Sequence, residues 1–335
     1  MNLTTRYMGL ELANPFVIGA GPLVKDTKLA QRLEASGASA LVMHSLFEEQ
    51  LTREQLAMHH HTTLHEDSFA EAVSYFPDPE DYHLGPDEYL EQIAKLKEAT
   101  SVPIIASLNG VTKGGWTEYA RLVQQAGADG LELNVYYLPI DLEETPQEVE
   151  DRYFDILKAV KGEITIPVAM KLSPFFTAPL NTMMRLDKAG ADALVLFNRF
   201  YQPDIDIEEL EVISALELSN SQDIRLRLRW LAACFGKVQA SLAITGGVHT
   251  AVDAVKAVMA GADVCQMTSA ILRHGPEYVQ TIKEDMVKWM TEHEYESIDQ
   301  MRGSMSLLRC PDPGAFERAN YMKVLQSWDL GTQSY

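Results

Sequence analysis

The chain has few cysteines, few cationic side chains and no long apolar run, and each shortage excludes a class of protein. Its 335 residues include three cysteines, an odd number without CxxC spacing. This pattern argues against a disulfide framework, a zinc site or an iron–sulfur site. We expect Cys234, Cys265 and Cys310 to be ordinary buried thiols.

Lysine and arginine together number 28 against 48 aspartates and glutamates, which gives a formal net charge of -20. Nucleic acids and anionic lipids are bound mainly by cationic side chains, so neither is an expected partner. No apolar run approaches the roughly 20 residues that span a bilayer. The opening MNLTTRYMGLELANPF has neither a basic end nor an apolar stretch typical of a signal peptide. We therefore expect a cytoplasmic protein.

Histidines gather in MHHHTTLHE (58–66). Three consecutive histidines cannot easily face one ion, and no cysteine or carboxylate stands at ligand spacing with them. We interpret the segment as a polar loop and expect no metal site.

A short phrase recurs four times and dominates the organisation of the chain. An amphipathic segment ends at Gly, followed by Ala, a small or acidic residue and an apolar run, as when a helix stops at a glycine and a turn leads into a buried strand. The four copies are LEASGASALVMHS (33–45), VQQAGADGLELN (123–134), LDKAGADALVLFN (186–198) and VMAGADVCQMTS (258–269). Four further apolar runs lie between them: 15–21, 102–110, 166–174 and 241–248.

The intervening segments carry apolar residues at three- and four-residue spacing, typical of helices that cover a sheet. Strand and helix thus alternate eight times, which predicts parallel strands in an α/β fold, a (β/α)8 TIM barrel. A doubly wound open sheet is the alternative. We expect one domain, 1–335, with insertions at 46–86 and 199–222 over the C-terminal face of the barrel, where such folds build active sites.

In a barrel the strand exits converge on one pocket, and here they are mostly small, amide or hydroxyl residues. Gly246 and Gly247 follow the seventh strand, and Thr268 and Ser269 follow the eighth, which are common phosphate-binding positions. The alternative is a glycine pair needed only for a tight turn. Lys171 interrupts an apolar strand and is either a surface residue at a frayed end or a cation facing an anionic ligand.

At these positions the sequence resembles the dihydroorotate dehydrogenase family of FMN-dependent barrels. The resemblance runs through NPFVIGAG (14–21), LELN (131–134), VAMKLSP (168–174), LFN (196–198), ITGGV (244–248), QMTSAI (266–271) and YESIDQMRGSMS (295–306). It implies an oxidoreductase of pyrimidine metabolism, with an external electron donor or acceptor, and relatives that are often homodimers.

The resemblance also implies roles for individual residues. Ala20 and Gly21 would pack on the flavin, while Ser45, Asn109, Asn134 and Lys171 would bond its ring. Gly246, Gly247, Thr268 and Ser269 would hold its phosphate, and Asn134 and Asn198 would contact the substrate.

Two strand ends depart from the family pattern. Where the family has LNxSCPN, with a Cys or Ser base, this chain reads LNVYYLP. Tyr136 therefore stands at the position of the family's Ser, Tyr137 at the position of its base, and Pro139 at the position of its last Asn. A family lysine at the second strand is replaced by His44. A phenol is a poor base but a competent acid at neutral pH, which favours reduction of an activated double bond.

We therefore expect an FMN-dependent oxidoreductase acting on a CH–CH or C=C bond of a pyrimidine-like or other small planar molecule, with Tyr137, Tyr136 or His44 as its proton-transfer residue. Four alternatives stay open. The tyrosines could be walls of an altered pocket, or the chain could oxidise dihydroorotate with a relocated base. It could also be a silent flavoprotein with a binding role, or a barrel without flavin that acts on a phosphorylated metabolite.

Overall fold

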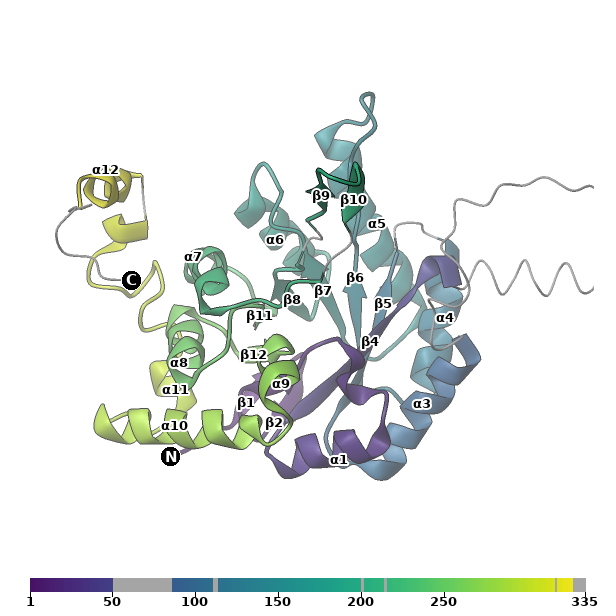
Figure 1. Cartoon of the computed structure of the whole chain (residues 1–335), viewed down its shortest axis with the longest axis horizontal. Helices are drawn as coiled ribbons and strands as arrows, with labels where there is room; N and C mark the ends of the chain where they lie inside the picture. Colours follow the sequence, from purple (N-terminus) through teal and green to yellow (C-terminus); the bar gives the residue numbers. More distant parts are fainter. Residues whose placement is uncertain (51–85, 111–113, 200–201, 214–215, 317, 328–335) are drawn as a thin grey trace, which may run out of the picture.

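The computed structural model describes residues 1–50, 86–110, 114–199, 202–213, 216–316 and 318–327. The histidine run at 58–66 and most of the first insertion lie outside the described residues. The second insertion contains a small hairpin of two strands, β9 (Asp204–Asp206) and β10 (Glu211–Ile213). It projects beyond the ends of the central strands (Figure 1).

Eight parallel strands close into a barrel, which confirms the predicted (β/α)8 fold and shows that the open-sheet alternative is wrong. In barrel order the strands are β3 (Phe16–Ile18), β4 (Ala40–Phe47), β5 (Ile104–Asn109), β6 (Gly130–Asn134), β7 (Val168–Leu172), β8 (Ala193–Leu196), β11 (Ser241–Thr245) and β12 (Val264–Met267). The ring closes where Cys265 of β12 pairs with Phe16 of β3.

Helices cover the outside of the barrel (Figure 1). They are α1 (Thr27–Ala35), α3 (Pro86–Ala99), α4 (Gly114–Gln125), α5 (Pro146–Glu163), α6 (Pro179–Lys188), α7 (Ile224–Cys234), α8 (Ala251–Ala260), α9 (Ser269–His274) and α10 (Tyr278–Glu292). The short α11 (Ile298–Met301) and α12 (Ala319–Gln326) follow. Among the described residues, no helix has the length and apolar content that crossing a membrane requires.

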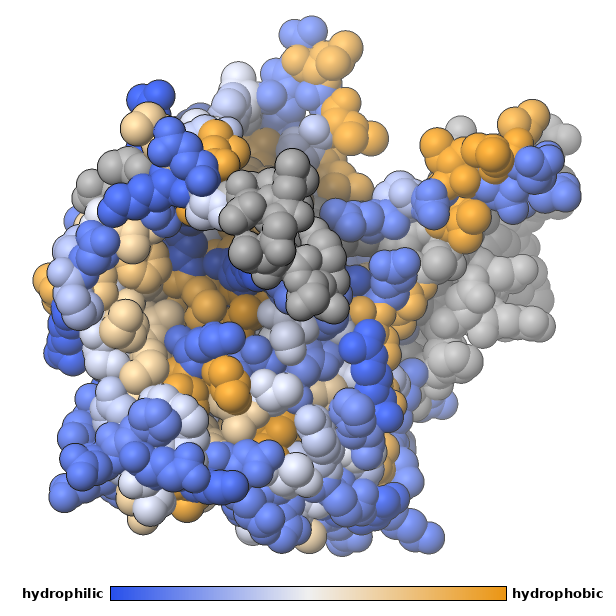
Figure 2. Space-filling model, turned by 60° about the vertical axis from the view of Figure 1, so that its left-hand side comes forward, coloured by the Kyte–Doolittle hydropathy of each residue, from blue (hydrophilic) through white to orange (hydrophobic). Residues whose placement is uncertain are grey.

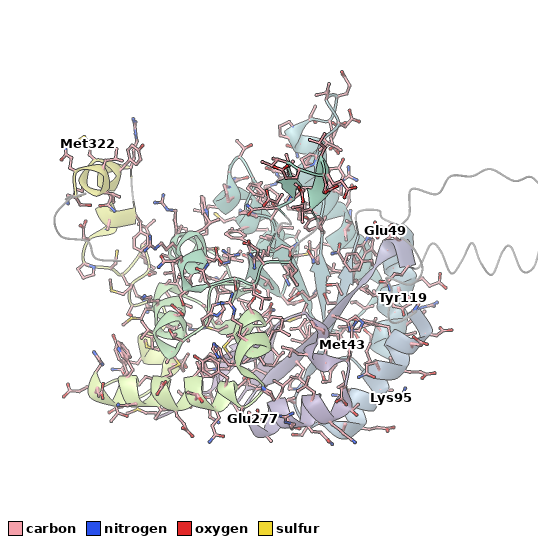
Figure 3. The ribbon with its side chains drawn as sticks, in the orientation of Figure 1. Met43, Glu49, Lys95, Tyr119, Glu277 and Met322 are labelled. Atoms are coloured by element: carbon pink, nitrogen blue, oxygen red, sulfur yellow. The ribbon has the colours of Figure 1, made fainter. Side chains whose placement is uncertain are left out.

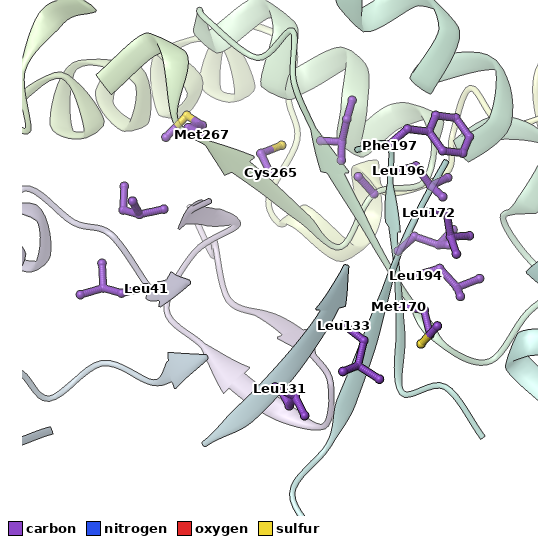
Figure 4. Close-up of a cluster of buried hydrophobic side chains, with 14 of the residues drawn as sticks. Leu41, Leu131, Leu133, Met170, Leu172, Leu194, Leu196, Phe197, Cys265 and Met267 are labelled. Carbon is purple, nitrogen blue, oxygen red and sulfur yellow. The ribbon is translucent and has the colours of Figure 1, made fainter. Parts of the chain in front are cut away.

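Strand alternation divides the core into an outer and an inner layer. Leu131 and Leu133 of β6 belong to the outer layer between strands and helices, with Leu41, Met170, Leu194 and Met267 from other strands (Figure 4). The inner layer is smaller and contains Val17, Val42, Ile105, Ala169, Val195 and Ala243.

A hairpin of β1 (Thr5–Tyr7) and β2 (Leu10–Leu12) closes the lower end of the barrel. Tyr7, Met8 and Leu12 pack against the inner layer. The hairpin is tied to the strand starts, because Met8 donates its backbone N–H to Ser241 Oγ at 3.2 Å and Thr5 Oγ1 donates to Asp263 O at 3.0 Å. The hairpin thus fills the lower half of the barrel interior.

Candidate functional site

The upper half of the barrel interior is polar, and its centre is a buried ion pair. Lys171 Nζ lies 3.1 Å from Glu132 Oε1. Gln266 Nε2 donates to the other carboxylate oxygen at 2.8 Å. Lys171 is 7% exposed and Glu132 is fully buried, so the interpretation of Lys171 as a surface residue is wrong. The expected partner of this charge is Glu132, which the sequence analysis did not identify.

An irregularity in β4 directs the side chains of two consecutive residues toward the barrel interior. The register against β5 shifts between Val42 and Ser45, where β4 has one residue more than its partner. Val42 faces the inner layer and Leu46 the outer one, so the extra residue allows His44 and Ser45 both to line the upper cavity. The two hydroxyls of Ser45 and Ser107 lie 2.8 Å apart.

His44 is a neutral imidazole at pH 7. Burial, followed by the nearby positive charge of Lys25, lowers the pKa of His44 from 6.5 to about 4. Its Nδ1 atom is buried without a hydrogen-bond partner, and its ring lies edge-on to Tyr89 of α3 with centroids 5.1 Å apart.

The two asparagines predicted to contact a substrate are bonded to each other. Asn198 Nδ2 donates to Asn134 Oδ1 at 2.8 Å across the barrel mouth. Asn109 lines the same cavity from the end of β5. The sequence prediction that these strand ends converge is confirmed in position, while their roles stay a prediction.

The two tyrosines after β6 have different surroundings. Tyr136 lines the upper cavity. The Tyr137 hydroxyl instead donates to Glu144 Oε2 at 2.7 Å, and the guanidinium of Arg152 lies 4.0 Å from its ring centroid. Arg152 Nη2 also bonds Glu144 Oε1 at 2.6 Å. The hydrogen bond to Glu144 is the main reason that the pKa of Tyr137 is raised.

The turn after β11 requires its two glycines. Gly246 and Gly247 have φ values of +82° and +88°, where residues with a Cβ are strained. A Cβ on Gly247 would collide with the backbone nitrogen of Ile224 at the start of α7. Arg227 of α7 supports this turn by donating Nε to Thr245 O at 2.5 Å. The backbone alone therefore accounts for the glycines, which leaves phosphate binding as a prediction.

The neighbouring exits of β3 and β12 approach each other closely. A Cβ added to Gly19 would lie 2.8 Å from Thr268 Oγ1, and one added to Gly21 would lie 2.7 Å from Thr268 Cγ2. Ser269 accepts a hydrogen bond from the Ser219 backbone N–H at 3.3 Å. The two glycines thus let the chain after β3 pack directly against the side chain of Thr268.

Two adjoining cavities occupy the C-terminal face. One, of about 750 Å³, is lined by Ala20, Gly21, His44, Ser45, Asn109, Asn134, Tyr136, Lys171 and Asn198. The other, of about 320 Å³, is lined by Gly246, Gly247, Gln266, Thr268 and Ser269. Ala20, Gly21, Lys171 and Asn198 line both, so the predicted ring-binding and phosphate-binding residues border two adjoining cavities, and of the predicted site residues only Tyr137 lies outside them.

Several residues of these cavities were not predicted. Glu132 and Gln266 each interrupt an apolar strand, which is the same sequence signal that Lys171 shows. Lys25 and Arg199 line the larger cavity, and no carboxylate does so among the described residues. Within the described residues, no group of three His, Cys, Asp or Glu side chains could hold a metal ion.

The fold and the site define a (β/α)8 barrel with two adjoining polar cavities at the exits of its strands. A family model described as dihydroorotate dehydrogenase matches residues 82–290, more than half of the chain. The chain therefore belongs to the dihydroorotate dehydrogenase family.

Two similar proteins cover nearly the whole length of the chain, and a third covers about two thirds of it. The "Dihydroorotate dehydrogenase B (NAD(+)), catalytic subunit" of Thermoplasma volcanium is 26% identical over 312 residues, 90% of this chain and 98% of the relative. The protein of the same description from Methanocaldococcus jannaschii is 26% identical over 301 residues, 87% of this chain and 94% of the relative. The "Putative dihydroorotate dehydrogenase A (fumarate)" of Aeropyrum pernix is 26% identical over 224 residues, 64% of this chain and 72% of the relative.

Proposed function

We propose that this chain is an FMN-dependent oxidoreductase that transfers hydride to or from a CH–CH or C=C bond of a small planar substrate. The observation that carries the proposal is the pair of adjoining cavities between Lys171 and the turn at Gly246 and Gly247. Polar side chains line the end near Lys171, and at the other end a ligand can approach the glycine backbone closely. This arrangement suits a phosphorylated ring.

The donor set is compatible with FMN. Lys171 and Gln266 present nitrogen donors beneath the cavities, and the Gln266 Oε1 atom is buried without a partner. Gly19 and Gly21 let the backbone after β3 lie close against Thr268. FMN, when bound, supplies reversible hydride transfer. The protein supplies orientation, charge and protons.

The substrate would lie over the larger cavity, near the Asn134–Asn198 pair. Three cations, Lys25, Lys171 and Arg199, line this cavity, and Lys171 is already paired with Glu132. In a protein of net charge -20, a cavity that the described residues line with cations and without carboxylates favours a ligand with an anionic group. Such a group would sit between Lys25 and Arg199.

Reduction of a double bond requires a proton at the carbon next to the one that accepts hydride. Tyr136 lines the cavity and carries a hydroxyl able to donate this proton, which solvent would then replace. Tyr137 is the second candidate, because its hydroxyl is held by Glu144 and its pKa is raised. Tyr136 is therefore our first choice of acid.

His44 is the candidate base for the rival reaction, oxidation of dihydroorotate. It lines the cavity as a neutral imidazole with an unpartnered Nδ1. Its pKa of about 4, however, makes it a weak acceptor of protons at neutral pH. This pKa favours the reductive direction, with Tyr136 as acid.

The electron partner would be external to the chain. Two of the relatives are described as NAD(+) enzymes and as catalytic subunits. We propose by analogy that this chain exchanges electrons with a soluble carrier or with a second protein.

Titration of the apoprotein with FMN tests the cofactor, with flavin fluorescence as the readout. We expect one FMN per chain; a protein that leaves the fluorescence of added FMN unchanged would refute the assignment. Dihydroorotate is then mixed with the loaded enzyme. We expect flavin reduction about two to four powers of ten slower than the roughly 10 per second of an ordinary enzyme. A rate near 10 per second would favour the relocated base.

A further inference from the structure

A separate cavity of about 680 Å³ lies at the lower end of the barrel, where the strands begin. It is lined by the chain just before β8 and β12, the first residues of β11, the turn of the β1–β2 hairpin and the segment after α11. Among the described residues, none lines both this cavity and those at the strand exits. Its volume is within the range of small-molecule sites.

The three carboxylates of the lower cavity already have donors. Asp192 and Asp263 belong to two copies of the repeated phrase, and each accepts a backbone N–H of a neighbouring strand start at 2.7 Å. Lys161 pairs with Asp192 at 2.6 Å, and Arg302 pairs with Asp263. Asp187 accepts two backbone N–H groups of the loop before β11, at 2.9 and 2.7 Å. These acids therefore hold the strand starts together.

The cations of the lower cavity have donors to spare. Arg309 Nη1 donates to the carbonyl oxygen of Arg302 at 3.3 Å, and its Cζ lies 5.1 Å from the ring centroid of Phe235. Within the part of the chain that the structure describes, Arg309 forms no ion pair. Arg6 Nε lies 3.9 Å from Glu11 Oε1, and because both side chains are well exposed this contact contributes little.

Arg302 and Arg309 are held close together although their charges repel. Burial, followed by the positive charge of Arg309, lowers the pKa of Arg302. The Phe235 ring that supports Arg309 is fixed in turn, because a Cβ on either Gly261 or Gly303 would collide with it. A pair of fixed guanidinium groups without a bridging carboxylate favours an anion that bonds both.

The remaining wall of the lower cavity is partly polar and partly apolar. The Ser241 hydroxyl accepts the Met8 N–H at 3.2 Å, and its own proton is not donated to any described residue. Val238, Leu242 and Leu308 add apolar surface. This mixture suits an organic molecule that carries an anionic group better than it suits a bare ion.

The lower cavity is open to solvent. Beyond α11 the chain leaves the barrel toward α12, which stands clear of the strands, as the position of Met322 shows (Figure 3). Arg6 and Arg309 are both exposed, so α12 leaves them accessible. Figure 2 shows hydrophilic residues along most of the lower edge of the molecule, where α10 lies in Figure 1. Because the whole chain has a net charge of -20, an anion binds best where cations gather.

We propose that the lower cavity binds a small organic phosphate, with the phosphate group between Arg302 and Arg309 and the organic part against Val238 and Leu308. Guanidinium groups suit this role because their paired N–H groups match the spacing of phosphate oxygens. Arg6 would approach the ligand from the hairpin, so that the ligand joins the hairpin to the segment after α11. The inference does not depend on flavin binding at the strand exits.

Calorimetric titration of the full chain with ADP tests the site. One equivalent of FMN is added first and the excess removed, and the titration is repeated without FMN. We expect one ADP per chain with a Kd below about 1 mM. Adenosine, which lacks the phosphates, should not bind, and pyrophosphate, which lacks the organic part, should bind at least threefold more weakly. No binding of ADP, or equal binding of adenosine, would overturn the proposal. Equal binding of pyrophosphate would show that the site takes an inorganic anion only.

Arginine variants locate the bound ADP. Arg309→Gln should weaken ADP binding at least tenfold and Arg6→Gln severalfold, while Arg302 is left unchanged because it pairs with Asp263. Arg121→Gln, at an exposed arginine of α4, is the matched control and should bind ADP normally. Arg199→Gln in the upper cavity should also have no effect. If Arg199→Gln abolishes binding and Arg309→Gln does not, ADP occupies the upper cavity and the proposal is wrong.

Hydrogen exchange measured by mass spectrometry gives a readout that is independent of the variants. ADP should slow amide exchange in peptides covering 6–10 and 302–309 and leave 244–250 and 266–271 unchanged. The opposite pattern would place ADP at the strand exits. Arg309→Gln should keep the FMN affinity of the wild type, so a chain that binds ADP but no FMN would refute the flavin assignment alone. Thermal unfolding checks that each variant keeps its barrel.

Discussion

At the scale of single residues, the two adjacent tyrosines of the LNVYYLP segment have separate surroundings. Tyr136 lines the cavity, while Tyr137 binds Glu144 and lies beneath Arg152 of α5. The Glu144 carboxylate bonds both Tyr137 and Arg152, so Tyr137 anchors the loop after β6 from outside the cavity. We infer that Tyr137 is a positioning residue and that Tyr136 is the acid.

Replacement of each tyrosine by Phe distinguishes the two tasks. In single-turnover oxidation of reduced enzyme by an unsaturated acceptor, Tyr136→Phe should lose about a hundredfold or more in rate, the lower range for a positioned acid. Tyr137→Phe should raise KM more than it lowers kcat, because the loop loses an anchor but the pocket keeps its hydroxyl. Equal rates in wild type and both variants would make the tyrosines pocket walls. The reverse order would make Tyr137 the acid.

His44 predicts a pH dependence of stability. Its pKa is about 4 in the folded protein and near 6.5 in the unfolded chain, so the unfolded chain binds more protons between these values. The unfavourable contribution of His44 to folding stability is absent above about pH 6.5 and grows as the pH falls toward 4. Urea unfolding of wild type and His44→Gln should therefore differ more at pH 4.5 than at pH 7, with wild type losing more. A pH-independent difference would contradict the lowered pKa.

At the scale of elements, short irregular stretches at strand ends create the site. The shift between Val42 and Ser45 in β4 admits two side chains to the pocket where regular alternation would admit one. The turn after β11 brings bare backbone to the cavity, because its glycines adopt a conformation closed to other residues. The helices support these features from behind, as Arg227 does for Thr245.

Gly247→Ala should damage both fold and cofactor binding. The positive φ alone costs about 1–2 kcal/mol, and the added carbon meets the backbone of α7. We expect FMN affinity to fall at least tenfold in fluorescence titration and the unfolding free energy to fall by about 1–3 kcal/mol. Gly162→Ala, in α5 with open space around it, is the control and should stabilise by about 0.5–1 kcal/mol. Unchanged FMN affinity in Gly247→Ala would place the phosphate elsewhere.

At the scale of the whole molecule, the barrel interior is divided into an apolar lower half and a charged upper half. The lower half contains Val17, Val42 and the N-terminal hairpin, while the upper half contains Glu132 and Lys171. The apolar half needs no ligand to be stable. The charged half depends on pairing, since an isolated buried charge is expensive.

Removing one member of the buried ion pair should therefore destabilise the fold more than removing both members. Lys171→Met leaves Glu132 fully buried without its cation, and we expect a loss of about 3–5 kcal/mol in urea unfolding. Adding Glu132→Gln should recover most of that loss, because no charge then needs compensation. A double variant less stable than the single one would show that the pair is a net source of stability.

The sequence predicted the barrel well because its signals are local. A glycine that ends a helix and an apolar run that follows it, as at Gly190 and Ala193–Leu196, are both read within a dozen residues. The hairpin β9–β10 was not predicted, since three-residue strands carry too little periodicity. The placement of Tyr137 was also beyond prediction, because Glu144 and Arg152 reach its side chain only through the irregular conformation of the loop between β6 and α5.

The seam between β3 and β12 has a consequence for synthesis on the ribosome. Phe16 pairs with Cys265, so β3, which is synthesised early, cannot form this pairing until β12 has been synthesised. Until residues 264–267 have left the ribosome, the nascent chain presents two open strand edges and an unfinished core, both of which invite aggregation. A messenger truncated before this point would yield a product without a closed barrel, so the pocket can exist only in a chain that is nearly complete.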